Sequence, residues 1–268
     1  LKNKVLMVIL HWAERLVDGY FAIIPRSKPC PAYIKRAALI AHRGAHNHKS
    51  GVIENTLPAF LRAQELGCWG VELDVHATAD GVLVVHHDPD LKRLWSKTER
   101  IDDLTFKQLR AIEPEVPSLE EVISACGKKI HLFIELKSPF DGVEALAQTL
   151  SGLSPENDYH LILLDKKILP LMSAFPKASI LLVANYNNVK ELCQLTLTKD
   201  YGGLLGNYLL VTKRCLLHLK NKKQKSGVGF INSKNSLYRE LNRGVYWIFT
   251  NKAEKMTLQL KSIGRGMD

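Results

Sequence analysis

Two histidines and three carboxylates stand at the ends of short apolar runs in the first half of this chain. His42 follows A-L-I-A, and His87 follows V-L-V-V-H. Glu72 and Asp74 lie two residues apart in V-E-L-D-V, and Glu135 lies in I-E-L-K. Carboxylate oxygens bind hard divalent cations, and histidines can move protons beside such an ion. The pattern predicts an enzyme that acts on a phosphate compound.

The three carboxylates are predicted metal ligands. Glu72 and Asp74 share one face of a strand, and two unpaired carboxylates inside a barrel would be costly. A cation resolves this, with Glu135 as the third ligand, and oxygen-only ligation indicates Mg²⁺ or Ca²⁺. Arg43 and Lys137 are predicted to hold the phosphate. The alternative is that these two cations merely form ion pairs with the carboxylates.

The two histidines are predicted to act as general acid and general base. His42 and His87 both stand at strand ends beside the acids, which favours catalysis over a structural role. His86 should face the opposite side of its strand. Glu54, in E-N-T, is predicted either to orient Arg43 or to join the metal shell.

His46 and His48 form an H-x-H pair, as in zinc-dependent barrel hydrolases. Here the strand is expected to end at His42, so the pair falls in a polar loop, and H-x-H alone is a weak signal. The later strand ends also lack the further histidines and the aspartate of a zinc site. The sequence therefore favours the carboxylate site.

Short apolar runs alternate with amphipathic segments from Ala38 onward, which is typical of parallel βα units. The expected strands are Ala38–Ala41, Val71–Val75, Val82–His86, Ile130–Leu136, His160–Leu164, Ser179–Val183, Gly203–Leu205, Val228–Ile231 and Tyr246–Phe249. Helical patterns lie between them, such as Leu57–Leu66, Leu119–Cys126, Val143–Leu150, Lys213–Lys220 and Leu237–Asn242.

These elements predict an α/β fold, a (β/α)₈ TIM barrel that is irregular near its second and third strands. Nine strands are expected where a barrel needs eight, and residues 76–81 are too few for a crossover helix. Either one strand is spurious or the region 76–86 is an excursion. Barrel enzymes carry their chemistry at the carboxyl ends of the strands, where the five residues of the predicted metal and proton-transfer site lie.

Residues 1–24 have apolar residues at helical spacing and are expected to form an extra N-terminal helix. It either packs on the barrel or lies on a membrane surface, because its apolar stretch is too short to span a bilayer. The prolines that follow indicate a linker. The predicted division is 1–31, helix and linker, and 32–268, a single barrel domain.

The charge and the cysteine content indicate which kinds of molecule the protein binds and in which compartment it lies. The 268 residues carry a formal net charge of +10, which favours anionic partners. The lysines of residues 220–225 have no interleaved aromatic residues, so nucleic acid is not expected. Five dispersed cysteines without C-x-x-C spacing are expected to be reduced core residues, which favours the cytoplasm, or the inner face of the membrane if residues 1–24 contact it.

Taken together, the motifs closely resemble the glycerophosphodiester phosphodiesterase family. The match comprises A-H-R-G at 41–44, E-N-T at 54–56, E-x-D-V at 72–75, D-G-x-x-V-V-x-H-D at 80–88 and I-E-L-K at 134–137. A fainter match, N-R-G-V-Y-W-I-F-T-N at 242–251, resembles the family's last strand. The resemblance covers about residues 38–255.

The resemblance implies a barrel related to phosphatidylinositol phospholipase C. It implies that Glu72, Asp74 and Glu135 bind calcium or magnesium, and that His42 and His87 are the acid and base. It also implies that residues of about 90–127 cap the site.

The expected activity is metal-dependent hydrolysis of a small glycerophosphodiester to glycerol 3-phosphate and an alcohol. Two alternatives stay open: a lysophospholipase D working at a membrane, and a phosphate-binding module without activity. The alcohol, the ion and the oligomeric state are not specified by the sequence.

Overall fold

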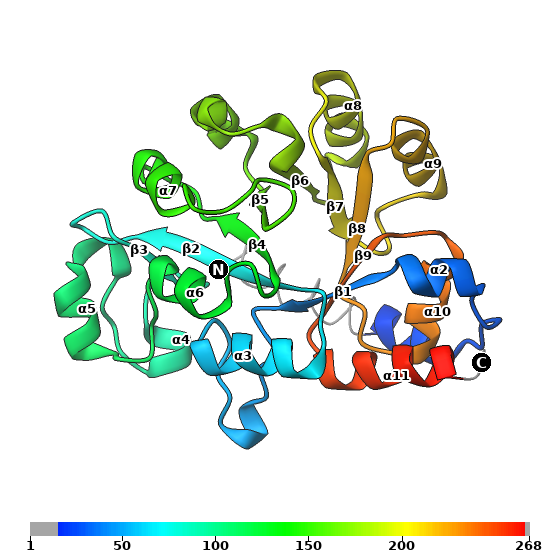
Figure 1. Ribbon diagram of the computed structural model, residues 1–268, viewed down its shortest axis with the longest axis horizontal. Helices are drawn as coiled ribbons and strands as arrows, with labels where there is room; N and C mark the ends of the chain where they lie inside the picture. Colours follow the sequence, from blue (N-terminus) through cyan, green and yellow to red (C-terminus); the bar gives the residue numbers. More distant parts are fainter. Residues whose placement is uncertain (1–15, 266–268) are drawn as a thin grey trace.

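Eight parallel strands close into a barrel with helices around it in the computed structural model, which describes residues 16–265 (Figure 1). The order is β1-β9-β8-β7-β6-β5-β4-β2, and pairing of β1 with β2 closes the ring. The predicted (β/α)₈ barrel is confirmed. The strands are β1 (Ala38–His42), β2 (Gly70–Ala77), β3 (Leu83–Val85), β4 (His131–Leu136), β5 (Tyr159–Leu163), β6 (Ile180–Ala184), β7 (Gly203–Asn207), β8 (Lys225–Gly229) and β9 (Trp247–Thr250).

Helices connect most of these strands on the outside of the barrel. They are α2 (Pro31–Arg36), α3 (Leu57–Leu66), α4 (Lys92–Trp95), α5 (Phe106–Ile112), α6 (Leu119–Cys126), α7 (Val143–Thr149), α8 (Val189–Lys199), α9 (Lys213–Asn221), α10 (Lys234–Asn242) and α11 (Ala253–Arg265). Between β5 and β6 the chain forms 3-10 turns instead, within Lys166–Ala174.

The ninth strand is an excursion. β3 pairs antiparallel with β2 and lies outside the closed ring, so the excursion predicted for residues 76–86 is confirmed. The expected strand Val228–Ile231 is about three residues too late, because β8 begins at Lys225. Its start, K-S-G, lacks apolar side chains. A Cβ on Gly227 would lie 2.6 Å from Leu205, so close packing inside the barrel demands glycine there.

Side-chain alternation divides the core into two parts. One face of each strand packs against the helices, as Val71, Leu73 and Val75 of β2 do. The other face fills the barrel, where a second cluster includes Phe133, Trp247 and Phe249. Four of the five cysteines are buried and all five are free, whereas Cys30 is exposed rather than in the core.

Residues 16–23 are helical and contact the barrel near β7 and α10. The Phe21 ring lies edge-on to Tyr208 at 5.9 Å, Asp18 accepts a hydrogen bond from the Tyr208 hydroxyl, and Asn235 donates to the Ala22 carbonyl at 2.7 Å. Leu16 remains exposed. The rest of the expected helix, residues 1–15, lies outside the described residues. Within 16–265, every helix is too short or too polar to cross a bilayer.

The segment between β3 and β4 has a small core of its own. Val84 of β3 packs there with Leu91, Ile101, Leu109 and Val116. The excursion that begins with β3 thus continues through α4 and α5. In contrast, α6 packs against α3 and β3. Capping boxes at Thr105 and Ser118 begin α5 and α6.

Candidate active site

Three carboxylates from two adjacent strands meet inside the carboxyl end of the barrel. Glu72 and Asp74 of β2 are 2% and 1% exposed, and Asp74 lies opposite Glu135 in the β2–β4 register. One oxygen from each of the three lies within 4.8 Å of the others. The structure thus brings together the three predicted metal ligands.

Burial and the mutual repulsion of the carboxylates shift the pKa values of this cluster. Burial and the charges of Asp74 and Glu135 raise the pKa of Glu72 well above its usual value, and the pKa of Glu135 is raised for similar reasons. Burial would also raise the pKa of Asp74, but Lys137 and Arg43 outweigh it and hold that pKa well below its usual range. A bound cation would remove this conflict.

Lys137 and Arg43 lie on either side of Asp74. The Lys137 ammonium lies 2.6 Å from Asp74 Oδ1 and also contacts Glu135, and Arg43 Nε lies 3.2 Å from Asp74 Oδ2. The ion pairs named as the alternative are therefore present, and phosphate binding by these two cations stays a prediction.

The donor set fits a hard divalent cation. Glu72 Oε1 is buried and accepts no hydrogen bond from any described residue, which costs free energy unless a ligand satisfies it. The donors are carboxylate oxygens, which suit Mg²⁺ or Ca²⁺ better than zinc. Among residues 16–265 this is the one cluster of histidine, cysteine or acidic side chains with such spacing.

His42 ends β1 beside the cluster. Its Nδ1 lies 2.6 Å from Asn251 Oδ1, so the ring donates to the amide oxygen, and its Nε2 lies 3.6 Å from Glu72 Oε2. Burial, with a further contribution from Arg43, lowers the pKa of His42 to about 3. Asn251 follows β9, the strand that pairs with β1. It stands in the fainter motif at 242–251, but nothing in that motif marked it as a partner of His42.

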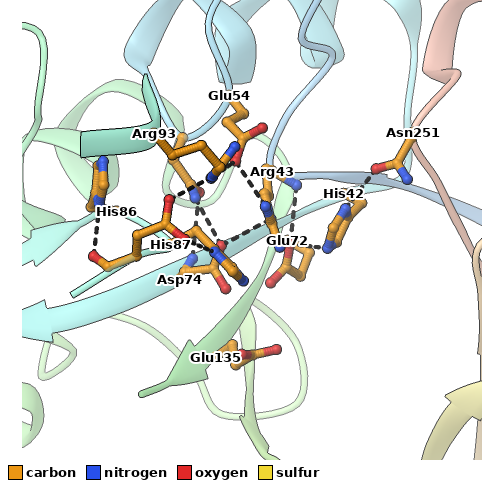
Figure 2. A network of polar contacts seen from close by, with 12 residues as sticks. His42, Arg43, Glu54, Glu72, Asp74, His86, His87, Arg93, Glu135 and Asn251 are labelled. Carbon is orange, nitrogen blue, oxygen red and sulfur yellow. Dashed lines mark hydrogen bonds and ion pairs between the residues drawn. The ribbon is translucent and has the colours of Figure 1, made fainter. Parts of the chain in front are cut away.

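His87 follows β3 and lies near Asp74, on whose carboxylate its charge acts (Figure 2). Its Nδ1 donates to Asp88 Oδ1 at 2.9 Å, which leaves Nε2 free to exchange a proton. Burial lowers the pKa of His87. His86 turns away, with Nδ1 2.9 Å from the Asp88 carbonyl and Nε2 accepting from Trp95, as strand alternation predicts.

Glu54 is not part of the acid cluster. It accepts from Arg43 NH1 at 2.8 Å and Arg93 NH2 at 2.7 Å, and these two cations lower its pKa to about 2 despite burial. Of the two predicted roles, the geometry matches orientation of Arg43. Arg93 also donates from Nε to Asp88 at 2.6 Å, so one side chain joins Glu54 to the partner of His87.

Sequence reasoning missed four residues of this network: Asn55, Asp88, Arg93 and Asn251. Asn55 donates to Asp74 Oδ2 at 2.8 Å from a left-handed backbone conformation, φ 58°. Asn55 and Asp88 belong to the quoted motifs E-N-T and V-V-x-H-D, so those motifs were the available signal. Arg93 had none, since it lies in the excursion outside the motifs.

His46 and His48 lie in the loop after β1, as expected. Their rings are 5.7 Å apart, His48 is exposed, and neither belongs to the carboxylate cluster. The geometry gives no support to a zinc site there.

A cavity of about 240 Å³ opens beside the cluster. His42, Glu72 and Glu135 line one side. The opposite wall is mostly apolar and comes from the strands β5–β9 and the loops after them: Ile162, Leu164, Val183, Leu205, Leu210, Phe230 and Phe249. The Phe230 ring lies 4.3 Å from the His42 ring, so this wall reaches the site itself.

Parts of this chain are similar to proteins named glycerophosphodiester phosphodiesterase. The model of the Glycerophosphoryl diester phosphodiesterase family matches residues 42–164. Glycerophosphodiester phosphodiesterase 1 of Bos taurus is 35% identical over 116 residues, which are 38% of this chain and 34% of that protein. The glycerophosphodiester phosphodiesterase of Caldanaerobacter subterraneus is 37% identical over 115 residues, 38% of this chain and 46% of its own length. The chain thus spans a third to a half of these curated relatives.

Solved structures match over more of the fold. A glycerophosphodiester phosphodiesterase from Thermotoga maritima gives a TM-score of 0.72 at 23% identity, covering 83% of this chain and 97% of that one. A phosphodiesterase from Oleispira antarctica, in complex with the product sn-glycerol-3-phosphate, gives 0.68 at 23% identity, covering 86% and 99%. On these matches, residues 42–164 are similar in sequence to the glycerophosphoryl diester phosphodiesterase family, and the barrel is similar in fold to solved phosphodiesterases of that name.

Proposed function

We propose that this chain hydrolyses a glycerophosphodiester to glycerol 3-phosphate and an alcohol, with a bound divalent cation. The observation that carries the proposal is the convergence of the three carboxylates Glu72, Asp74 and Glu135 between His42 and His87. The family match and the product named for the Oleispira antarctica protein support the substrate class.

Glu72, Asp74 and Glu135 would hold the ion, Mg²⁺ or Ca²⁺. When bound, it would supply positive charge that polarises a phosphoryl oxygen. Arg43 is held by Glu54 with its guanidinium toward the cluster and would bind the phosphate together with Lys137.

The histidines carry the proton transfers in this proposal. One takes the proton from the attacking oxygen, which belongs to water or to the substrate's neighbouring glycerol hydroxyl. As the new P–O bond forms, the bond to the alcohol breaks, and the other histidine protonates the departing oxygen. If the glycerol hydroxyl attacks, the product of this step is a cyclic phosphate, which water then opens to give glycerol 3-phosphate. His42 is oriented by Asn251 and His87 by Asp88, so each presents Nε2 for this exchange.

The decisive test measures choline release from glycerophosphocholine, which leaves glycerol 3-phosphate, and from lysophosphatidylcholine, which leaves an acylated glycerol phosphate, with Mg²⁺ and Ca²⁺ in parallel. We expect release from glycerophosphocholine that a chelator abolishes, and a loss of roughly 10²-fold or more in His42→Ala and in His87→Ala. Metal binding by each variant, followed by calorimetry, shows that the site is still assembled.

His218→Ala is the matched control, because His218 is exposed on α9, whose residues do not line the cavity of the candidate active site. It should retain activity. Near-normal turnover in His87→Ala with metal bound would overturn the acid–base assignment. Release preferred from lysophosphatidylcholine would replace the proposal with a lysophospholipase D, and no release from either substrate would favour a binding module.

A further inference from the structure

A basic groove lies at the opposite end of the barrel from the acids. A cavity of about 660 Å³ is lined by residues of α9 and α2 and by residues at the end of α10. Figure 1 shows these three helices on one side of the molecule. The floor of the cavity includes Lys225, the first residue of β8. The other end of that strand, Gly229, lines the cavity of the candidate active site, roughly 13 Å away at about 3.3 Å per residue.

The groove is lined by six cations, and none of the described residues that line it is acidic. The cations are Arg36, Lys213, Lys220, Lys223, Lys225 and Arg243. Arg243 is used internally, because its guanidinium pairs with the buried Glu240 at 2.7 Å. Within residues 16–265, no carboxylate lies within ion-pair distance, 4.0 Å, of the other five. Four of these five cations, Arg36, Lys213, Lys220 and Lys223, thus line a shared hollow with no ion-pair partner among residues 16–265, whereas the charge of Glu156 acts on Lys225 from beyond ion-pair distance.

An exposed leucine stands among these cations. Lys213, Leu217 and Lys220 follow each other at intervals of four and three residues, so they form one stripe along α9. Leu217 is 55% exposed and lines the groove with them. A large exposed apolar side chain flanked by lysines is typical of helices that bind anionic lipid membranes, where the lysines contact the headgroups and the apolar side chain enters the layer below them.

Two partly exposed tyrosines, Tyr33 and Tyr246, line the groove, and Lys225 lies over the second of them. Lys225 Nζ lies 5.7 Å from the Tyr246 ring centroid and 5.2 Å from that of Trp247, and Trp247 is fully buried. Single-stranded nucleic acid is bound through exposed aromatic faces together with basic grooves. Because Lys225 lies over the Tyr246 ring, and an exposed leucine rather than an aromatic ring stands among the lysines of α9, the groove fits lipid phosphates better than nucleic acid.

We propose that this groove docks the protein on the surface of an anionic lipid bilayer. Lys213, Lys220, Lys223 and Arg36 contact the lipid phosphates, and Leu217 enters the boundary below the headgroups. The carboxyl end of the barrel then faces away from the bilayer, so its cavity opens to substrate dissolved in water. This surface differs from residues 1–24, for which membrane contact was one of the two placements that the sequence left open.

The test compares binding to phosphatidylglycerol–phosphatidylcholine vesicles and to pure phosphatidylcholine vesicles by cosedimentation. The full chain should bind the anionic vesicles, less tightly as salt rises, and leave the neutral ones in the supernatant. The triple variant K213Q/K220Q/K223Q should lose about fivefold in affinity per lysine, on the order of 100-fold in all. Leu217→Ser should weaken binding at high salt, where charge attraction is screened.

The triple variant K49Q/K107Q/K190Q is the matched control, since it removes the same charge from exposed lysines elsewhere. It should bind like the unaltered chain. Equal binding by both triple variants would overturn the proposal and assign any membrane contact to another surface. Groove-dependent binding of inorganic pyrophosphate or an oligonucleotide without vesicle binding would overturn it too. The groove variant should still release glycerol 3-phosphate, so this test stands apart from that of the proposed function.

Discussion

Arg93 joins two halves of the candidate site that the sequence keeps apart. Its guanidinium donates to Asp88, the partner of His87, and to Glu54, the partner of Arg43 (Figure 2). Side chains that orient catalytic or ligating groups commonly contribute tenfold or more without touching the substrate. Arg93 is therefore a positioning residue in this arrangement, supplied by α4 of the excursion.

We expect Arg93→Gln to lower kcat by roughly 10- to 100-fold while the bound metal is retained, because Asp88 and Glu54 lose their shared donor. Steady-state kinetics on glycerophosphocholine measure it, and Arg93→Lys should recover part of the loss. Arg100→Gln is the control, since Arg100 lies in the same excursion and pairs only with exposed acids. Similar kcat values for the two glutamine variants would contradict the positioning role.

The three crowded carboxylates are predicted to destabilise the metal-free protein, although they are the predicted ligands of the metal ion. Glu72→Gln removes a buried like charge, so the metal-free protein should be as stable as the unaltered chain or more so. The unaltered chain should gain thermal stability on addition of Mg²⁺ or Ca²⁺ through binding to the folded state, and the variant should lose most of that gain. Melting temperatures with chelator and with each ion test both parts. An equal metal-induced gain in the variant would exclude Glu72 as a ligand.

At the scale of elements, the turn after β1 fixes Arg43. Gly44 has φ 76°, and a Cβ there would lie 2.8 Å from the Ala59 backbone in α3. The Ala45 amide donates to the Ala59 carbonyl at 2.8 Å, so this turn rests directly on the helix. Arg43 itself adopts φ 55°, which points its backbone amide at Glu72 Oε2, 3.0 Å away. The A-H-R-G motif thus encodes a packing geometry as well as chemical groups.

Gly44→Ala should destabilise the fold by about 1–2 kcal/mol for the left-handed backbone and about 1–3 kcal/mol more for the clash with α3. Gly51→Ala is the matched control: Gly51 has φ 73° with open space around it, so only the backbone cost applies. Urea unfolding of both variants gives the difference. Equal losses of unfolding free energy would mean that α3 yields to the added methyl group.

At the scale of the whole molecule, the amino end of the barrel interior is closed by two buried histidines. His131 and His160 are 5% and 1% exposed. His131 Nδ1 donates to the Asn157 carbonyl at 2.9 Å, so its Nε2 accepts from His160 Nδ1 at 2.7 Å, and both rings are neutral in this arrangement. Burial lowers the pKa of His131 to about 4 and that of His160 to about 2.

These shifts make the fold acid-sensitive. Because both folded-state pKa values lie below the ordinary 6.5, the neutral pair is fully stabilising above pH 6.5. The free energy of unfolding should fall as pH drops from about 6.5 toward 4, by on the order of 3 kcal/mol for His131 alone. Unfolding in urea at several pH values measures the slope. His160→Gln should reduce it, whereas replacement of the exposed His218 by Gln should not; an unchanged slope in His160→Gln would contradict this account.

The sequence by itself determined the barrel and most of the site, because both follow from local rules. Strand alternation sets Glu72 and Asp74 on one face and separates His87 from His86, and βα alternation sends their strand ends to one side of the barrel. Only the tertiary structure decided contacts between distant segments: Asn251 reaches His42 because the last strand closes the ring, and Arg93 reaches Glu54 because the excursion packs back on it. The tertiary structure also decided where β8 begins, because close packing at Gly227 leaves no periodic pattern in the sequence. It decided as well that the late lysines line a groove, because the placement of α2, α9 and α10 beside one another cannot be read from the sequence.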